Sequence, residues 1–127
     1  MKPNLTGLRI LVVDDDECLR EILVEMLTRY GAFICVSSSG KNALECLVSD
    51  RFDAIISDMR MPDGDGLFLA NEVAKFKGHK PIFFILSGYN DLTPEQCRDG
   101  EIKLILEKPI KMSALAEIIQ EAIKARL

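Results

Sequence analysis

The sequence has little of what zinc sites, disulfide scaffolds and membrane spans require. It contains one histidine, His79, and four cysteines, of which no two form a Cys-x-x-Cys pair. We therefore expect neither a structural zinc site nor a disulfide framework, and we predict reduced, packed thiols. No segment approaches the ~18 apolar residues of a membrane helix, and Asp14 to Asp16 interrupt the first apolar run too early for a signal peptide. These absences predict a cytoplasmic protein without a membrane partner.

Positive charge is also in short supply. The chain has 16 Lys and Arg residues against 20 Asp and Glu, which gives a net charge of −4 and an isoelectric point near 5.0. This balance argues against direct binding to nucleic acid. The 127 residues are 48% hydrophobic, which is enough for one domain with a buried core. We expect a single domain over residues 1–127, with its core at about 8–126 and no segment left for an output domain.

Apolar runs alternate with helical periodicity along the whole chain. The runs predict strands at residues 8–13, 32–36, 52–56, 81–86 and 102–106. Between the runs, apolar residues recur at the three- and four-residue spacing of amphipathic helices. This alternation predicts an α/β fold: a doubly wound, five-stranded parallel sheet with helices on both faces.

Several expected helix ends follow from local chemistry. Gly31 closes the first helix, Ser39 caps the second, and Gly78 is expected to end the third. The run Thr93 to Gln96 has the capping pattern of a helix start, but the residues that follow it up to Gly100 are few and polar. Because such a segment has few apolar residues to bury, we predict a fourth helix that is short, mobile or displaced.

Polar side chains follow four of the predicted strands. Asp14 and Asp15 follow the first strand, Asp58 the third, Ser87 the fourth and Lys108 the fifth. Ligands of open α/β sheets bind at this edge, and clustered carboxylates repel one another unless a cation offsets them. Oxygen ligands suit Mg²⁺, and one carboxylate could attack phosphorus to form an aspartyl phosphate. The arrangement predicts a metal-assisted phosphoryl-transfer site.

In these positions the chain resembles the receiver domains of two-component response regulators, and the single-domain CheY-like type in particular. The resemblance covers the whole chain and implies a flavodoxin-like (CheY-like) fold of five βα units. It rests on five groups of residues: Leu11 to Asp15, Ser38 to Gly40 with Ala43-Leu44, Asp58 to Pro62 with Asp65-Gly66, Ser87-Gly88, and Lys108-Pro109.

The resemblance implies roles for the acidic residues. Asp58 would accept a phosphoryl group from a phosphohistidine on a partner kinase. Mg²⁺, or Mn²⁺ in its place, would be held by Asp15, Asp58, the backbone carbonyl of Arg60 and, through water, Asp14. We expect the third acid of the cluster, Asp16, to cap a helix or to be solvated, because an aspartate interacts well with a helix start.

The resemblance also implies a phosphoryl-binding set and partners. Ser87 would be the switch hydroxyl, Lys108 would pair with the phosphoryl group, and Pro109 would hold the following loop by a cis bond. The partners would be a sensor histidine kinase or a histidine phosphotransfer protein and a downstream protein target that the sequence does not name. A phosphorylation-dependent homodimer is a further expectation.

Three positions depart from the family pattern or tune it. Ile105 stands where the family usually has an aromatic switch residue, so we predict that the signal does not travel by the usual aromatic rotamer change. Arg60 and Tyr89, two positions after the acceptor and the switch hydroxyl, are both large. Large residues there imply slow loss of the phosphoryl group.

Four alternatives stay open at this point. The chain could be a receiver module cut from a hybrid histidine kinase or a larger regulator. It could be an aspartyl-phosphate hydrolase of the haloacid-dehalogenase type that uses Asp14-x-Asp16, although the residues that follow and a cap insertion are missing. A flavodoxin-type cofactor module is disfavoured because three aspartates repel phosphate. A pseudo-receiver is disfavoured because all key side chains are present.

Overall fold

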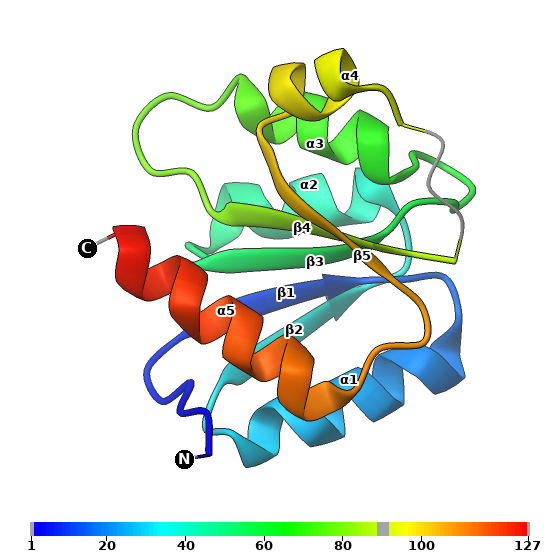
Figure 1. The fold of residues 1–127 in the computed structure, drawn as a ribbon. Coiled ribbons are helices and arrows are strands. Elements are labelled where there is room, and N and C mark those ends of the chain that lie inside the picture. Colours follow the sequence, from blue (N-terminus) through cyan, green and yellow to red (C-terminus); the bar gives the residue numbers. More distant parts are fainter. Residues whose placement is uncertain (1, 89–91, 127) are drawn as a thin grey trace.

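The computed structural model describes residues 2–88 and 92–126, in which five strands alternate with five helices (Figure 1). The elements are β1 (Arg9–Val13), α1 (Glu17–Arg29), β2 (Phe33–Ser37), α2 (Gly40–Ser49), β3 (Ala54–Asp58), α3 (Gly66–Ala74), β4 (Ile82–Ser87), α4 (Pro94–Asp99), β5 (Ile102–Glu107) and α5 (Met112–Arg126). None of the described helices is long and apolar enough to cross a membrane.

The strands form one parallel sheet in the order β2-β1-β3-β4-β5. The predicted α/β class and the doubly wound parallel sheet are confirmed. β1 and β3 are central and buried, whereas β2 and β5 are edge strands with exposed side chains such as Val36 and Leu104. Chain order reverses beside β1, and ligands of such sheets bind at the carboxyl ends of the strands near this reversal.

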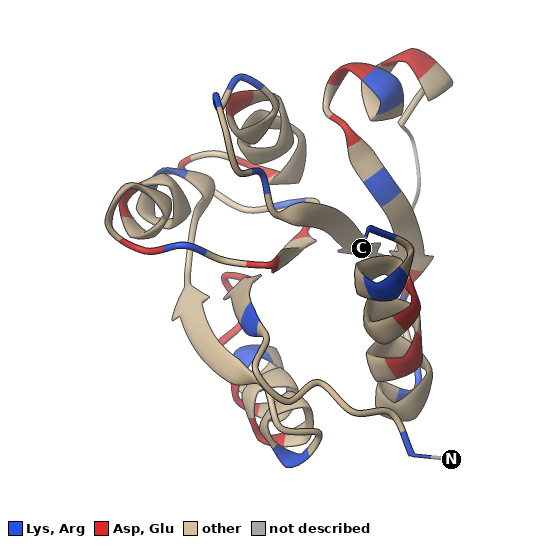
Figure 2. Cartoon of the chain, turned by 90° about the vertical axis from the view of Figure 1, so that its left-hand side faces the viewer, with Lys and Arg blue, Asp and Glu red and all other residues tan. Residues whose placement is uncertain are grey.

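Two apolar cores lie on opposite faces of the sheet. One core joins α1 and α5 to β1, β3 and β4 through side chains such as Leu23 and Leu115. The other joins α2 and α3 to the opposite faces of the same strands, through side chains such as Leu69. Figure 1 shows α1 and α5 below the sheet and α2 and α3 above it. Charged residues lie mainly on the helices and loops around this apolar centre (Figure 2).

Side-chain caps begin four of the helices. The carboxylates of Asp16 and Asp65 accept hydrogen bonds at the starts of α1 and α3, and Ser39 does the same at α2. Thr93 and Gln96 form the complete capping box that their sequence predicts at α4. The caps expected at Asp16 and Ser39 are therefore confirmed.

Some expected boundaries are wrong. α3 ends at Ala74 rather than near Gly78, because the amides of Lys75 and Phe76 bond three residues back and close the helix. Phe76 still packs on the core, and Gly78 supplies a positive φ in the loop that follows. Predicted strand limits are displaced by one or two residues: Asp58, for example, is the last residue of β3 and not a residue beyond it.

The four cysteines are free thiols, but they are not all packed as expected. Cys35, Cys46 and Cys97 are half-buried, while Cys18 is exposed. Cys18 lies in the first turn of α1, whose buried positions are those of Leu23 and Leu27. Its thiol is therefore on the solvent side of an amphipathic helix.

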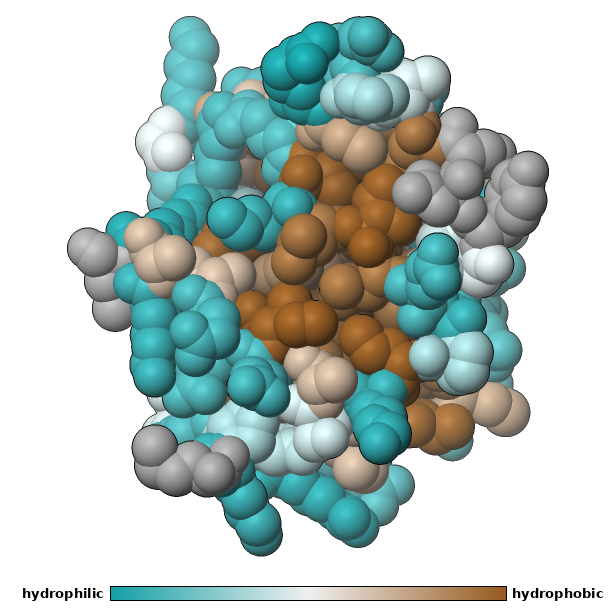
Figure 3. All heavy atoms as spheres, viewed as in Figure 1, coloured by the Kyte–Doolittle hydropathy of each residue, from teal (hydrophilic) through white to brown (hydrophobic). Residues whose placement is uncertain are grey.

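The fourth helix is short, as predicted, and none of its six residues is buried. It lies against α3 and against β5 (Figure 1). Beside it, apolar side chains are visible at the surface between α4 and α5, over the edge strand β5 (Figure 3). An open groove there, lined by Leu104 and Ile118 among others, measures about 570 Å³.

Candidate functional site

Strand register brings the acidic residues together. Val13 of β1 pairs with Ser57 of β3. The residues that follow them, Asp14 and Asp58, therefore lie side by side at the carboxyl edge of the sheet. One carboxylate oxygen from each of Asp14, Asp15 and Asp58 lies within 4.8 Å of the others. The expectation that β1 and β3 deliver these side chains to one place is therefore met by the geometry.

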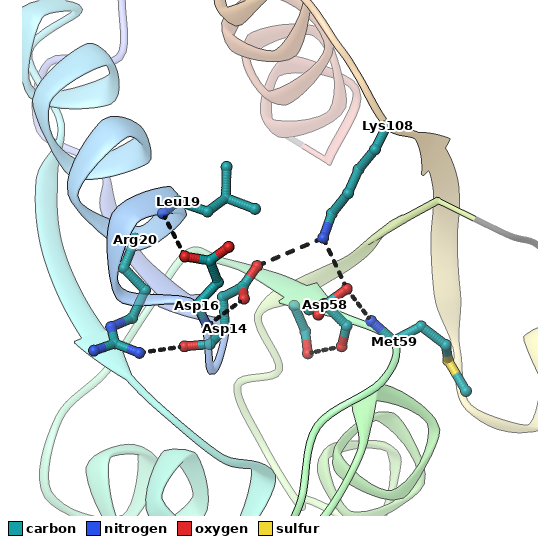
Figure 4. Close-up of polar contacts among 8 residues, drawn as sticks. Asp14, Asp16, Leu19, Arg20, Asp58, Met59 and Lys108 are labelled. Carbon is teal, nitrogen blue, oxygen red and sulfur yellow. Dashed lines mark hydrogen bonds and ion pairs between the residues drawn. The ribbon is translucent and has the colours of Figure 1, made fainter.

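Lys108 reaches this cluster from the end of β5. Its Nζ donates to Asp58 Oδ1 at 3.0 Å and lies 3.7 Å from Asp14 Oδ2 (Figure 4). The backbone N–H of Lys108 donates to the carbonyl of Ser87 at 2.9 Å, which ties this loop to the end of β4. The peptide bond from Lys108 to Pro109 is cis, as the resemblance implied.

Asp14 is the buried member of the cluster. Asp14 is 2% exposed, and its Oδ1 accepts a hydrogen bond from the Asp16 N–H at 2.9 Å. Burial raises the pKa of the Asp14 carboxyl above its ordinary value of 3.8, and the negative charge of Asp58 raises it further. The Asp16 N–H and the Lys108 ammonium oppose this rise. The site therefore holds more negative charge than its own groups neutralise.

Asp58 is more open than Asp14. Its side chain is 14% exposed, and its Oδ1 accepts hydrogen bonds from the Met59 N–H and from Lys108. Both of these bonds go to Oδ1, so within the described part of the chain Oδ2 keeps its lone pairs for other partners. One oxygen is thus held while the other can serve as a metal ligand or a nucleophile.

The remaining acids of the cluster differ in role. Asp15 is exposed and contributes an oxygen to the three-carboxylate group. Asp16 accepts from the Leu19 N–H at 3.2 Å and caps α1, with its carboxylate directed toward the helix (Figure 4). Because Asp16 is engaged as a cap, the geometry does not favour the Asp14-x-Asp16 pairing that the hydrolase alternative needs.

The other predicted site residues are placed as follows. Ser87 is buried at the end of β4, and its carbonyl holds the Lys108 loop. Ile105 of β5 is half-buried and packs against the α2–α3 core. The Arg60 side chain is exposed in the loop after β3. Tyr89 lies outside the described residues.

One contact at the site was not predicted from the sequence. The guanidinium of Arg20 donates from Nη1 to the backbone carbonyl of Asp14 at 2.6 Å (Figure 4). Arg20 sits near the start of α1, where a cation opposes the helix dipole. A positive charge near a helix start is unfavourable, and this feature of the sequence could have indicated that the Arg20 side chain binds a group outside the helix.

The donor set fits a hard divalent cation. Three carboxylates face a single ammonium group, which leaves two negative charges to be offset. The available ligands are all oxygens, the kind that Mg²⁺ prefers, and an exposed Asp15 leaves room for the waters that Mg²⁺ usually retains. The residues present therefore suit Mg²⁺ better than a metal that prefers nitrogen or sulfur ligands.

Comparison with known proteins agrees with the fold. The response regulator receiver domain model matches residues 10–120. The chain belongs to the response regulator receiver domain family.

Three relatives show the breadth of this family. The response regulator protein PilR of Pseudomonas aeruginosa is 30% identical over 119 residues, which are 93% of this chain and 26% of PilR. A CheY-like receiver domain from Methylobacillus flagellatus has a TM-score of 0.82 at 30% identity, with 91% of this chain and 98% of that chain covered. The receiver domain of the P. aeruginosa sensor histidine kinase PA1611 has a TM-score of 0.81 at 29% identity, with 94% and 99% covered.

Two further facts come from these relatives. The PA1611 receiver domain was solved with a magnesium ion coordinated in its active-site cleft. The present chain spans about a sixth to a quarter of the length of the first curated relatives it matches, 16% of a plant ethylene receptor and 26% of the response regulator PilR. The receiver module thus occurs in larger proteins of several kinds.

Proposed function

We propose that Asp58 accepts a phosphoryl group in a Mg²⁺-dependent reaction and that the modified chain changes its binding to a partner. The observation that carries this proposal is the position of the Asp58 carboxylate. It accepts a hydrogen bond from Lys108 Nζ, which also lies 3.7 Å from Asp14, and it shares the acidic cluster with Asp14 and Asp15. A carboxylate so placed can become an acyl phosphate whose added negative charge would be offset by Lys108 and by a cation held among the carboxylates.

The transfer step is a displacement at phosphorus. Oδ2 of Asp58 forms the new O–P bond while the N–P bond of a phosphohistidine breaks and the imidazole leaves with that electron pair. Lys108 is already bonded to Oδ1 and is placed to follow the phosphoryl oxygens. Ser87, at the end of the adjacent strand β4, would donate its hydroxyl to one of them. Mg²⁺ held by Asp15, Asp58, the Arg60 carbonyl and, through water, Asp14 would offset the charge that develops; Mn²⁺ would act likewise.

The donor would be a sensor histidine kinase or a histidine phosphotransfer protein. The phosphoryl-transfer and hydrolysis steps would be catalysed by the receiver residues themselves, without turnover of an external substrate. Phosphorylation would alter binding to a downstream protein, and a phosphorylation-dependent homodimer is one form that this response could take. The chain would act without direct contact to nucleic acid, in line with its net charge of −4.

The lifetime of the phosphoryl group would depend on the residues that border it. Arg60 follows Asp58 by two positions and is exposed, and Tyr89 stands at the matching place after Ser87. Two large side chains there would restrict the approach of water to phosphorus. We expect a half-life much longer than seconds, measured as decay of the phosphorylated species after removal of the donor.

Intact-mass measurement tests the proposal. The chain is incubated with a small phosphodonor, with Mg²⁺ or with a chelator, as wild type, Asp58→Asn and Asp63→Asn. Asp63 is an exposed acid with φ of 56°, a conformation that asparagine tolerates, so Asp63→Asn is a matched control. Wild type and Asp63→Asn should gain one phosphoryl group with Mg²⁺ only, and Asp58→Asn should gain none. An equal gain in Asp58→Asn, or none in wild type, contradicts the proposal.

A further inference from the structure

The three consecutive aspartates are attached to the first turn of α1 by a set of backbone contacts. The Asp16 carbonyl accepts from the Arg20 N–H at 3.0 Å, and the Asp16 carboxylate accepts from the Leu19 N–H. The Asp14 carbonyl accepts from the Arg20 guanidinium at 2.6 Å. Arg20 therefore holds the acidic loop at two points, once through its backbone and once through its side chain.

The exposed ligand Asp15 lies between two peptide groups that are both held. The peptide group before Asp15 carries the Asp14 carbonyl, which Arg20 binds. The peptide group after it carries the Asp16 N–H, which donates to Asp14 Oδ1. Holding both flanking peptide planes fixes the direction of the Asp15 Cα–Cβ bond, and this limits the positions that its solvent-exposed carboxylate can reach.

We propose that Arg20 is a positioning residue for metal binding: by clamping the Asp14–Asp15 peptide plane, it orients the Asp15 carboxylate toward Asp14 and Asp58. The inference rests on the metal-binding part of the proposed function. Outer groups that orient metal ligands raise metal affinity by about 10- to 100-fold in other sites. Arg20 does so here through the main chain and not through a contact with the ligand oxygen.

The positive charge of Arg20 and its positioning of the loop have opposite expected effects on metal affinity. Arg20 is a cation close to a site for a divalent cation, so its charge alone disfavours metal binding. Replacement by an uncharged residue would tighten metal binding if only the charge mattered. Weaker binding after that replacement is therefore a result that the charge of Arg20 does not explain, and the stability of the variant in chelator separates positioning from a merely structural role.

The test measures metal affinity without any phosphorylation step. Arg20→Met removes the guanidinium donor and its charge but keeps an unbranched side chain and a similar helix propensity. Arg29→Met, in the last turn of the same helix, removes an exposed arginine paired with Glu25 and serves as the matched control. Mn²⁺ affinity is followed by electron paramagnetic resonance of the free ion, Mg²⁺ affinity by competition, and stability by thermal unfolding in chelator.

We expect Arg20→Met to bind Mn²⁺ and Mg²⁺ about 10-fold more weakly than wild type, Arg29→Met to match wild type, and Arg20→Lys to restore part of the affinity. Unchanged or tighter binding in Arg20→Met overturns the inference and leaves the phosphoacceptor proposal standing. A loss of affinity that only follows a loss of folded protein in chelator also overturns it. No binding of either ion by wild type overturns the inference together with the metal dependence of the proposed function.

Discussion

The loop after β1 and the helix α4 are held in different ways. In the β1 loop, the amide, the carbonyl and the carboxylate of Asp14 all form hydrogen bonds, and α1 behind it buries Leu23 and Leu27. α4 has a complete capping box but no buried residue. We therefore expect the loop that carries the metal ligands to be fixed before any ligand arrives, and α4 to be displaced at a lower energetic cost.

The largest expected difference between the two regions is in stability. Leu23→Ala in α1 should lower the free energy of unfolding by about 2–5 kcal/mol, because Leu23 is fully buried in the core. Cys97→Ala in α4 should change it by less than about 1 kcal/mol, because Cys97 is only partly buried. Urea denaturation measures both variants. Equal losses would show that α4 contributes to stability as much as α1 does.

Amide hydrogen exchange tests the same comparison without mutation. We expect the α4 amides to exchange with an opening free energy at least about 2 kcal/mol below that of α1 and α5, because α4 opens without exposing core side chains. The prediction that this helix is mobile depends on this measurement. Protection in α4 equal to that in α5 contradicts it.

The rigid side of the comparison has a pH dependence set by Asp14. Because burial raises the pKa of Asp14 in the folded protein, its protonation favours the folded state and its ionisation opposes it. In chelator at pH 7, Asp14→Asn should therefore be more stable than wild type. This advantage should shrink as the pH falls through the raised pKa and disappear below 3.8, the ordinary value.

Denaturant unfolding at a series of pH values measures this difference. Adding Mg²⁺ at pH 7 should reduce the difference in unfolding free energy between Asp14→Asn and wild type. A bound cation offsets the charge of ionised Asp14 and therefore stabilises wild type more than the variant. If the stability of Asp14→Asn relative to wild type increased as the pH fell, a raised pKa of Asp14 in the folded protein would be contradicted.

The smallest expected effect concerns Ile105, a half-buried residue of β5, the strand that α4 contacts. Ile105→Ala should leave phosphorylation itself intact, since Ile105 packs against the α2–α3 core and not against the carboxylates. It should reduce the change in α4 hydrogen exchange that phosphorylation causes. A normal change in this variant would show that Ile105 only fills the core and is not part of the switch.

Much of the fold was predictable because it rests on local signals that agree with one another. The caps at Asp16, Ser39 and Thr93 depend on residues within one helical turn, and the alternation of strands and helices depends on apolar periodicity. The meeting of Asp14 and Asp58 follows from parallel strands ending at one edge. These predictions needed no knowledge of distant packing.

The missed features depend on three-dimensional contacts. The end of α3 at Ala74 is set by how the chain turns to place Phe76 on the core, and nothing local at Gly78 reveals it. The contact of Arg20 with the Asp14 carbonyl depends on the path of the loop between β1 and α1. The periodicity of α1 marks Arg20 only as a polar position.

Reductive trapping identifies the residue that carries the phosphoryl group. Borohydride converts a phosphorylated aspartate into homoserine, and peptide mass mapping locates that residue in the chain. After incubation with a phosphodonor and Mg²⁺, the account predicts homoserine at position 58 alone and none when a chelator replaces Mg²⁺. Homoserine at position 14, 15 or 16, or none at any position in a chain that has gained a phosphoryl group, would contradict the account.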